Sequence, residues 1–104
     1  NYSIKNMKNY KITPEQVNAI RVIEHFIQTK KIPDMKVFDL TNPNNIILHT
    51  DKNIILIGDL EDFIMKIKTI FQLEALSKNT KNELEYIDVR YWKNPVLKVK
   101  EGSD

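Results

Sequence analysis

The chain lacks cysteine altogether, and its 104 residues include only two glycines and one tryptophan. Without cysteine there is no disulfide, no thiolate zinc site and no cysteine nucleophile. The glycines stand far apart, at Gly58 and Gly102, so there is no glycine-rich phosphate-binding loop, and neither a nucleophile elbow nor a metal-spaced histidine pair is present. We therefore expect a protein that is not an enzyme and that holds no cofactor and no metal.

Strong charge of one sign and long apolar runs are also missing. Sixteen basic residues are interleaved with fourteen acidic ones, for a net charge of +2, which leaves no dense basic run for a nucleic-acid backbone. No stretch approaches the roughly 20 apolar residues that a membrane helix needs, and the amino end does not resemble a signal peptide. Because the chain starts at Asn1 instead of methionine, we expect a part of a longer protein, and any membrane anchor would lie in the part that is missing.

What is present is the composition of one folded domain. Apolar residues make up 41% of the chain and charged residues 29%, and low-complexity tracts are absent. A chain of this length supports a single core. We expect an N-terminal segment without clear periodicity over residues 1–12, a domain over residues 13–100 and a short tail over residues 101–104.

A first helix is predicted from Thr13 to residues 30–31. Thr13 is a good N-cap, Gln16 stands where a capping box needs its second member, and Pro14 fits the first turn. Pro33 disfavours helical geometry at the residue before it and so marks the end. Apolar residues form one stripe along this helix: Val17, Ile20, Ile23 and Ile27.

Three short apolar segments and a second amphipathic helix follow. Residues 35–40, 46–50 and 54–57 are separated by turn residues and are typical of strands, the last one typical of a sheet centre. Asp59 is the expected N-cap of the second helix, and the polar residues 77–83 the expected loop after it. One side of this helix is apolar: Leu60, Phe63, Ile64, Ile67, Ile70, Phe71 and Leu73.

The last quarter of the chain has the pattern of a β-hairpin. In its first arm, Ile87, Val89 and Tyr91 alternate with Tyr86, Asp88, Arg90 and Trp92, as a period of two requires. The pair Asn94-Pro95 interrupts the pairing. The fold class expected from the whole order is α+β, with a mixed, mainly antiparallel sheet covered by two helices and ending in a hairpin with an exposed edge strand.

The second arm, residues 96–100, is the expected edge. Lys98 and Lys100 give it the charge typical of an edge that stays exposed and can accept another strand. Leu97 and Val99 should share the face that points to the core, with Val96 and the two lysines on the other. We expect an outward N–H at Val96 or Lys98, so that proline at one of them blocks docking.

Three polar clusters admit more than one interpretation. His25 and His49 could form an acid–base pair in a small nucleic-acid-binding or processing domain, although no motif surrounds either of them. The carboxylates at 59, 61 and 62 could bind a cation, but acidic residues are also common where a helix begins. Tyr86, Arg90 and Trp92 are of the kinds that anchor interfaces, or they cover the sheet beneath a helix.

The chain resembles the carboxy-terminal β domain of the FtsQ/DivIB family of bacterial cell-division proteins, from about Thr13 to Val99. The resemblance rests on the order of three segments: Phe-Asp-Leu-Thr-Asn-Pro at 38–43, Ile-Ile-Leu-Ile-Gly-Asp-Leu-Glu at 54–61 before a helix, and Tyr-Ile-Asp-Val-Arg-Tyr at 86–91. It implies a single-pass membrane protein with this domain on the extracytoplasmic side and without enzymatic activity.

The resemblance also implies partners. Members of this family recruit and regulate septal peptidoglycan synthesis by binding small coiled-coil proteins, FtsB or DivIC together with FtsL, and the partner adds a strand to the last strand of the domain. Arg90 and Tyr91 match the family's interface Arg-Tyr pair, and residues 96–100 match the accepting strand. Because the alternation places Tyr91 with Ile87 and Val89, either a bulge turns the strand after Arg90 or Tyr91 is partly buried. The expected partner-binding residues are therefore Arg90, Tyr91, Trp92, Val96, Leu97, Lys98 and Val99. A secreted or phage-encoded interaction domain with another partner is equally compatible with the sequence.

Overall fold

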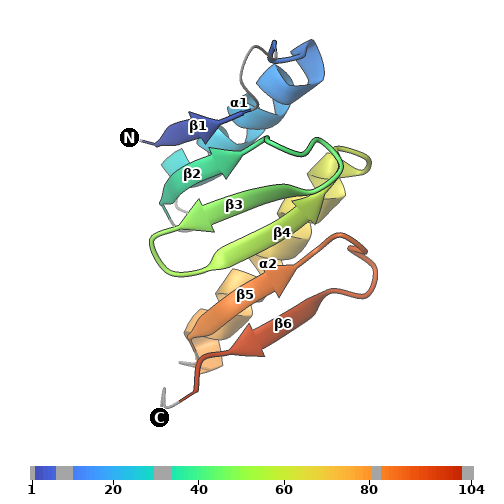
Figure 1. The fold of residues 1–104 in the computed structure, drawn as a ribbon. Coiled ribbons are helices and arrows are strands. Elements are labelled where there is room, and N and C mark those ends of the chain that lie inside the picture. The colour runs from blue at the N-terminus through green and yellow to red at the C-terminus, as the bar shows by residue number, and fades with distance from the viewer. Residues whose placement is uncertain (1, 7–10, 30–33, 81–82, 102–104) are drawn as a thin grey trace.

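A computed structural model describes residues 2–6, 11–29, 34–80 and 83–101. These residues form a six-stranded sheet whose strands follow one another in chain order, and Figure 1 shows both helices behind it. The α+β class expected from the sequence is confirmed. The elements are β1 (Ser3–Lys5), α1 (Pro14–Gln28), β2 (Met35–Asp39), β3 (Ile46–Thr50), β4 (Ile54–Gly58), α2 (Phe63–Thr80), β5 (Leu84–Asp88) and β6 (Val96–Val99).

The sheet is mixed. Strands β2, β3 and β4 form an antiparallel meander, and β5 and β6 form an antiparallel hairpin. The helix α2 carries the chain back across the sheet, so β5 pairs with β4 in parallel. The strand β4 has neighbours on both sides, which confirms that residues 54–57 lie inside the sheet.

The N-terminal segment contributes β1, which the sequence pattern leaves undefined. This strand pairs with β2 in parallel, and the Leu40 N–H donates to the Lys5 carbonyl over 2.7 Å. The Tyr2 hydroxyl donates to Glu24 of α1, and burial together with this carboxylate raises the pKa of Tyr2 to about 12. Residues 7–10 lie outside the described residues. The hydroxyl contact holds the start of the chain against α1.

The first helix begins as predicted and ends slightly earlier. The Gln16 N–H donates to the Thr13 hydroxyl over 3.1 Å, and the Gln16 side chain accepts from the Thr13 N–H over 2.9 Å, which completes the capping box. The helix ends at Gln28, where the Thr29 N–H donates to the His25 carbonyl. The expected end at residues 30–31 falls outside the described residues, as does Pro33.

The predicted bounds of the second helix are wrong at both ends. Asp59 does not cap it, because its carboxylate accepts from the Glu61 N–H in a separate turn and α2 begins only at Phe63. Asp62, with a φ of 54°, makes the transition, and its carbonyl accepts from the Lys66 N–H. At the other end α2 runs to Thr80, into the expected loop. Polar side chains on an exposed last turn do not stop a helix.

The core lies between the helices and one face of the sheet. Its fully buried members come from α1, α2, the strands β2 to β5 and the residues that directly follow β2 and β5. The largest are Phe38, Ile23, Leu40, Ile46, Leu48, Ile55, Ile57, Ile67, Ile70, Ile87 and Val89. The opposite face of the sheet carries half-buried or exposed side chains such as Ile47, Ile54 and Tyr86. The helices therefore cover a single face.

Truncation of Ile67 should test this core. Ile67→Ala should lower the free energy of unfolding by about 3 kcal/mol, because Ile67 is fully buried and its loss leaves a cavity. Ile64, on the same helix, is 46% exposed, so Ile64→Ala should change the free energy by less than about 0.5 kcal/mol. Urea unfolding of both variants measures the difference, and equal losses would contradict the assigned face of α2.

Candidate functional site

The site expected from the sequence lies at the last strand of the sheet and in the turn before it. Strand β5 ends at Asp88, and the Val89 N–H still donates to the Leu56 carbonyl over 2.9 Å. From Arg90 onward the chain turns, and the Asn94 N–H donates to the Tyr91 carbonyl. The predicted alternation therefore holds through Val89. The chain then turns instead of burying Tyr91, whose residue surface is 79% exposed.

Arg90 is held by two features of the neighbouring strands. Its guanidinium forms a two-pronged ion pair with Asp88, with Nη2 at 2.6 Å from Oδ2 and Nε at 2.9 Å from Oδ1. Its aliphatic stem crosses Gly58, where a Cβ atom would stand 3.1 Å from the Arg90 Cγ. The Arg90 N–H also donates to Asp88. Arg90 is thus fixed in place by its own domain.

The ion pair shifts the titration of both partners. The side-chain hydrogen bonds from Arg90 are the largest cause that holds the pKa of Asp88 below its ordinary value, and they outweigh the burial that opposes them. The same bonds raise the pKa of Arg90. Asp88 therefore stays ionised at neutral pH, so its ion pair with Arg90 is present in that range.

Trp92 fastens the turn to α2. Its indole N–H donates to the Asp62 carboxylate over 3.2 Å, and the Lys93 ammonium lies 5.5 Å from the centre of its ring. Asp62 is the left-handed residue before the helix, so this backbone conformation presents its carboxylate to the turn. Trp92 is half-buried, while Tyr91 beside it projects freely. The turn thus has one exposed aromatic ring, that of Tyr91, next to a tryptophan whose position is fixed by a hydrogen bond.

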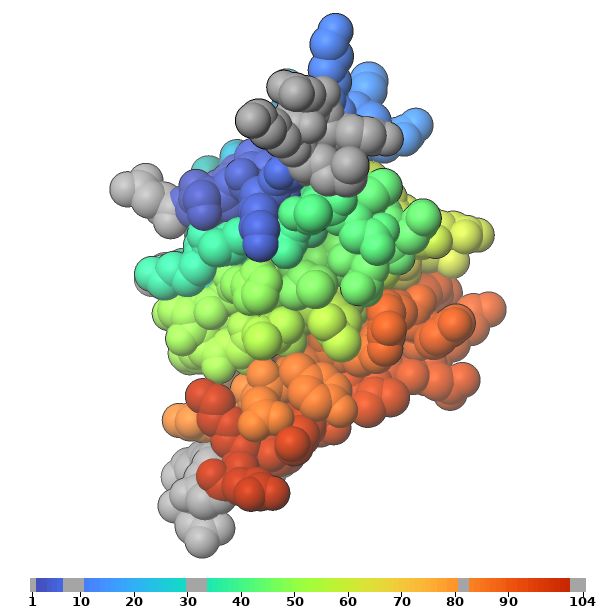
Figure 2. All heavy atoms as spheres, viewed as in Figure 1, coloured from blue at the N-terminus to red at the C-terminus, as the bar shows by residue number. Residues whose placement is uncertain are grey.

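Strand β6 is an edge of the sheet. Among the described residues it pairs with β5 alone, and Figure 2 shows the red residues of the terminal hairpin along the lower edge of the molecule, away from β1. Leu97 lies opposite Ile87 and Val99 opposite Leu84, which places both on the core face as predicted. Each of the two is nevertheless 38% exposed, because burial by α2 fades at this strand.

The backbone groups of β6 alternate between the hairpin and the open side. The Lys100 N–H donates to the Glu83 carbonyl over 2.9 Å, so it points toward β5. Since successive N–H groups point to opposite sides of a strand, those of Lys98 and Val96 also point toward β5, and those of Leu97 and Val99 point outward. The expected outward N–H at Val96 or Lys98 is therefore wrong by one residue.

The lysine in β6 and the lysine directly after it pair with glutamates across the hairpin. Lys98 Nζ lies 3.1 Å from Glu85, and Lys100 Nζ lies 3.8 Å from Glu83, with all four side chains largely exposed. Ion pairs of this kind contribute little stability. The two glutamates neutralise the charge of the two lysines at this edge. The edge therefore exposes apolar side chains next to ion pairs. Val96, on the same face as the lysines, is 52% exposed.

The competing constellations do not assemble. His25 lies exposed on α1, where its ring packs against Phe26, whereas His49 faces the uncovered side of the sheet, opposite Val37 and Ile54. The sheet therefore separates the two imidazoles. Asp59 binds Lys66 and Asp62 binds Trp92, and the described residues contain no cluster of three metal-ligating side chains.

Comparison with known proteins gives no relative. No family model matches the chain, and neither a curated protein nor a solved structure matches it significantly. Within the described ranges, neither helix has the length and apolar character needed to cross a membrane.

The residues that organise the turn are the ones the sequence pattern does not identify. Asp88, Gly58 and Asp62 hold Arg90 and Trp92, but they come from three different elements. The Asp88 contact has a local signal, an aspartate two residues before an arginine. The contact of Arg90 with Gly58 and the hydrogen bond of Trp92 to Asp62 depend on the parallel pairing of β4 and β5. No local sequence pattern indicates either contact.

The Asp88–Arg90 pair predicts a pH-dependent stability. Asp88→Asn should lower the free energy of unfolding by about 1 kcal/mol at pH 7, since it removes a charge-assisted contact whose arginine is half exposed. Because the folded pKa of Asp88 is depressed, the wild-type advantage is present above the ordinary value of about 3.9 and is lost as the pH falls below it.

Urea unfolding at pH 7 and at pH 2.5 measures this difference. Asp51→Asn, a change at an exposed turn residue, is the matched control and should have little effect at either pH. A difference between wild-type and Asp88→Asn that is equal at both pH values would contradict the ion pair as its source.

Proposed function

We propose that this chain is the extracytoplasmic β domain of an FtsQ/DivIB-like cell-division protein. It acts as a non-enzymatic scaffold that regulates septum formation by binding FtsB/DivIC-type partners, together with FtsL-type proteins, through strand addition to β6. The observation that carries the proposal is the open side of β6, where Leu97 and Val99 direct their backbone groups outward beside the exposed Tyr91.

The chemistry of this edge suits an extended peptide. An added strand would satisfy the outward N–H and C=O groups of Leu97 and Val99, and each backbone hydrogen bond contributes about 1 kcal/mol net. It would also cover the exposed parts of the Leu97 and Val99 side chains, which β5 and α2 leave in contact with water. Backbone pairing and apolar burial would therefore act together.

The turn at the start of β6 adds an anchor at one end of the edge. Arg90 and Trp92 are fastened to Asp88 and Asp62, so their side chains lose little conformational entropy when a partner binds. Tyr91 offers a large ring to the partner, and tyrosine is among the residues that most often dominate interfaces. The Arg-Tyr pair of the family resemblance thus consists of Arg90, whose side chain is held by an ion pair, and Tyr91, whose ring is exposed.

The fold supports the family resemblance in its order of elements. The resemblance depends on a strand ending in Gly-Asp, an amphipathic helix and a closing hairpin, and the structure has β4, α2 and the β5–β6 hairpin in this order. The placement outside the cytoplasm, on a protein anchored upstream, follows from the resemblance and is part of the proposal. The nucleic-acid alternative has no support from geometry, since its two histidines lie on different layers.

Proline at an outward position should abolish binding. In calorimetric titrations with the extracytoplasmic carboxy-terminal segment of the same organism's DivIC/FtsB-like protein, Leu97→Pro should lose saturable binding, because proline has no N–H to donate to the added strand. Leu97→Ala removes the same side chain but keeps the N–H, and it should bind with only modestly reduced affinity. Circular dichroism establishes that both variants are folded.

The titrations should be run at two salt concentrations. Equal affinities of Leu97→Pro and Leu97→Ala would contradict strand addition at β6. Absence of binding by the unaltered domain would remove the reason for naming this partner. Binding of a nucleic acid that weakens steeply with salt would instead favour the alternative function.

Truncation of the free ring should weaken binding without affecting the fold. Tyr91→Ala should reduce the affinity for the same segment at least tenfold, the range of an interface hot spot, and should leave the melting temperature unchanged because the ring is mostly in water. Lys93→Ala, in the same turn, is the matched control. A Tyr91→Ala domain with full affinity would exclude this ring from the interface.

A further inference from the structure

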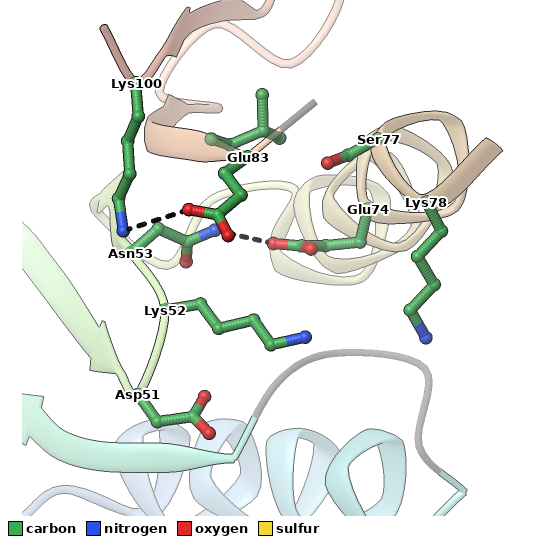
Figure 3. Close-up of a pocket in the computed structure, with 9 residues that line it drawn as sticks. Asp51, Lys52, Asn53, Glu74, Ser77, Lys78, Glu83 and Lys100 are labelled. Carbon is green, nitrogen blue, oxygen red and sulfur yellow. Dashed lines mark hydrogen bonds and ion pairs between the residues drawn. The ribbon is translucent and has the colours of Figure 1, made fainter. Parts of the chain in front are cut away.

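A hollow of about 400 Å³ opens at the end of the sheet opposite the Tyr91 turn. The β3–β4 turn, the last part of α2, the start of β5 and the residue after β6 converge there (Figure 3). Its lining includes carboxylates and lysines from all of these segments: Asp51, Lys52, Glu74, Lys78, Glu83 and Lys100. The binding edge described above does not use this hollow.

The floor of the hollow is fixed by the β3–β4 turn. The Asn53 side-chain oxygen accepts from the Thr50 hydroxyl over 2.9 Å, and that hydroxyl oxygen accepts from the Asn53 N–H. The Thr50 hydroxyl also lies 3.1 Å from the Asn53 backbone carbonyl, so it is the neighbouring Glu74 carboxylate, which only accepts, that favours the amide nitrogen on the side facing α2. The Asn53 amide nitrogen then donates to Glu74 Oε1 over 2.9 Å. The turn therefore holds one oxygen of the Glu74 carboxylate in a set position.

Glu74 is the unusual residue of this hollow. Only 6% of its surface is exposed, and Figure 3 shows its carboxylate pointing from α2 into the hollow, toward Asn53 and Glu83. Among the ion pairs of the described residues, none includes Glu74, while Glu83 is already paired with Lys100. Buried carboxylates are usually paired with a cation. Within the part of the chain that the structure describes, the hydrogen-bond partner of Glu74 is the neutral amide of Asn53 instead.

We infer that Glu74 is the anchor of a binding site for an ammonium or guanidinium group. A cation in the hollow would meet the Glu74 carboxylate directly, with Glu83 close by. Lys52 and Lys78 line the same hollow, so the site favours a cation whose carrier is neutral or negative elsewhere. A lysine or arginine side chain flanked by a carboxylate is the simplest group with this chemistry.

The group could be part of a docked partner or of a small molecule. Lys100 follows β6 directly and lines the hollow, so a peptide added along β6 and continuing past Val99 would arrive here. The site itself does not depend on that route, since its geometry comes from Asn53 and Glu74. Its test therefore uses small probes first and the partner segment second.

The direct test follows the side-chain amide signals of Asn53 by nuclear magnetic resonance. N-acetyl-L-lysine, acetylated at the α-nitrogen so that its side-chain ammonium group is free, should shift these signals saturably, with a dissociation constant in about the millimolar range. N-acetyl-L-norleucine, which lacks only the ammonium group, should not shift them. Glu74→Gln keeps an oxygen for Asn53 but has no charge, and it should abolish the response to N-acetyl-L-lysine. An equal response to both probes, no saturable response, or an undiminished response in Glu74→Gln would overturn the site.

Stability measurements separate the proposed site from an internal ion pair. If Glu74 has no cation of its own, Glu74→Gln should melt at the same temperature as wild type or higher. Lower melting temperatures of similar size in Glu74→Gln and Lys78→Ala would show that Lys78, one helical turn away, already neutralises the carboxylate, and would overturn the proposal.

The partner segment then distinguishes the two sources of the cation. Displacement of N-acetyl-L-lysine by the DivIC/FtsB-like segment supports the site as the receptor for a basic side chain of the partner. Retention of the probe while the segment is bound supports the site as one for a separate small cation. A segment that fails to bind at all counts against the proposed function, and the response to N-acetyl-L-lysine is read independently of it.

Discussion

Burial of one sheet face against two helices is the constraint on which the other features depend. Ile67 and Ile70 of α2 are fully buried, as are Ile55 and Ile87 on the strands they cover. This burial fades toward the last strand, where Leu97 points to the same side but remains 38% exposed. The two helices therefore do not cover the whole sheet, and β6 lies at the margin that they leave exposed. The domain owes its stability to β2–β5, and β6 is attached mainly through its pairing with β5.

The turn before β6 compensates for this incomplete cover. Arg90 lies across Gly58 and binds Asp88, while Trp92 binds Asp62 at the start of α2. These contacts connect the hairpin to β4 and to the helix, so the start of β6 is held although its side chains are not buried. An edge strand that is held in this way can be exposed and still keep a fixed conformation, so a peptide that paired with it would lose less entropy in ordering it.

Much of the fold could be predicted from the sequence because local signals are strong there. The capping box at Thr13, the three strands of the meander and the terminal hairpin each have a local pattern, and the structure confirms them. The bounds of α2 could not be predicted, since the left-handed conformation of Asp62 and the helical last turn have no such pattern. The N-terminal strand β1 could not be decided from the sequence, because three residues are too few to show a period.

The exposed edge and its turn were predictable in their location in the chain, but the geometry of their residues was not. An edge with lysines near the chain end pointed to β6, and Arg90, Tyr91 and Trp92 were identified by residue type. The orientation of Tyr91 depends on where β5 ends, and the direction of each N–H in β6 depends on the pairing with β5. Neither follows from alternation alone. The contacts of Glu74 and Asn53 join residues 21 positions apart and require the folded chain.

The pairing of β5 with β6 shifts by one residue between Leu84 and Tyr86, where β5 contains a residue more than its partner. A bulge of this kind increases the local twist of the two strands. An edge that is short and strongly twisted cannot continue as a flat ribbon from one copy of the chain to the next, as fibrils require. The register shift thus limits the growth of an aggregate from β6, although this strand is exposed at the edge of the sheet.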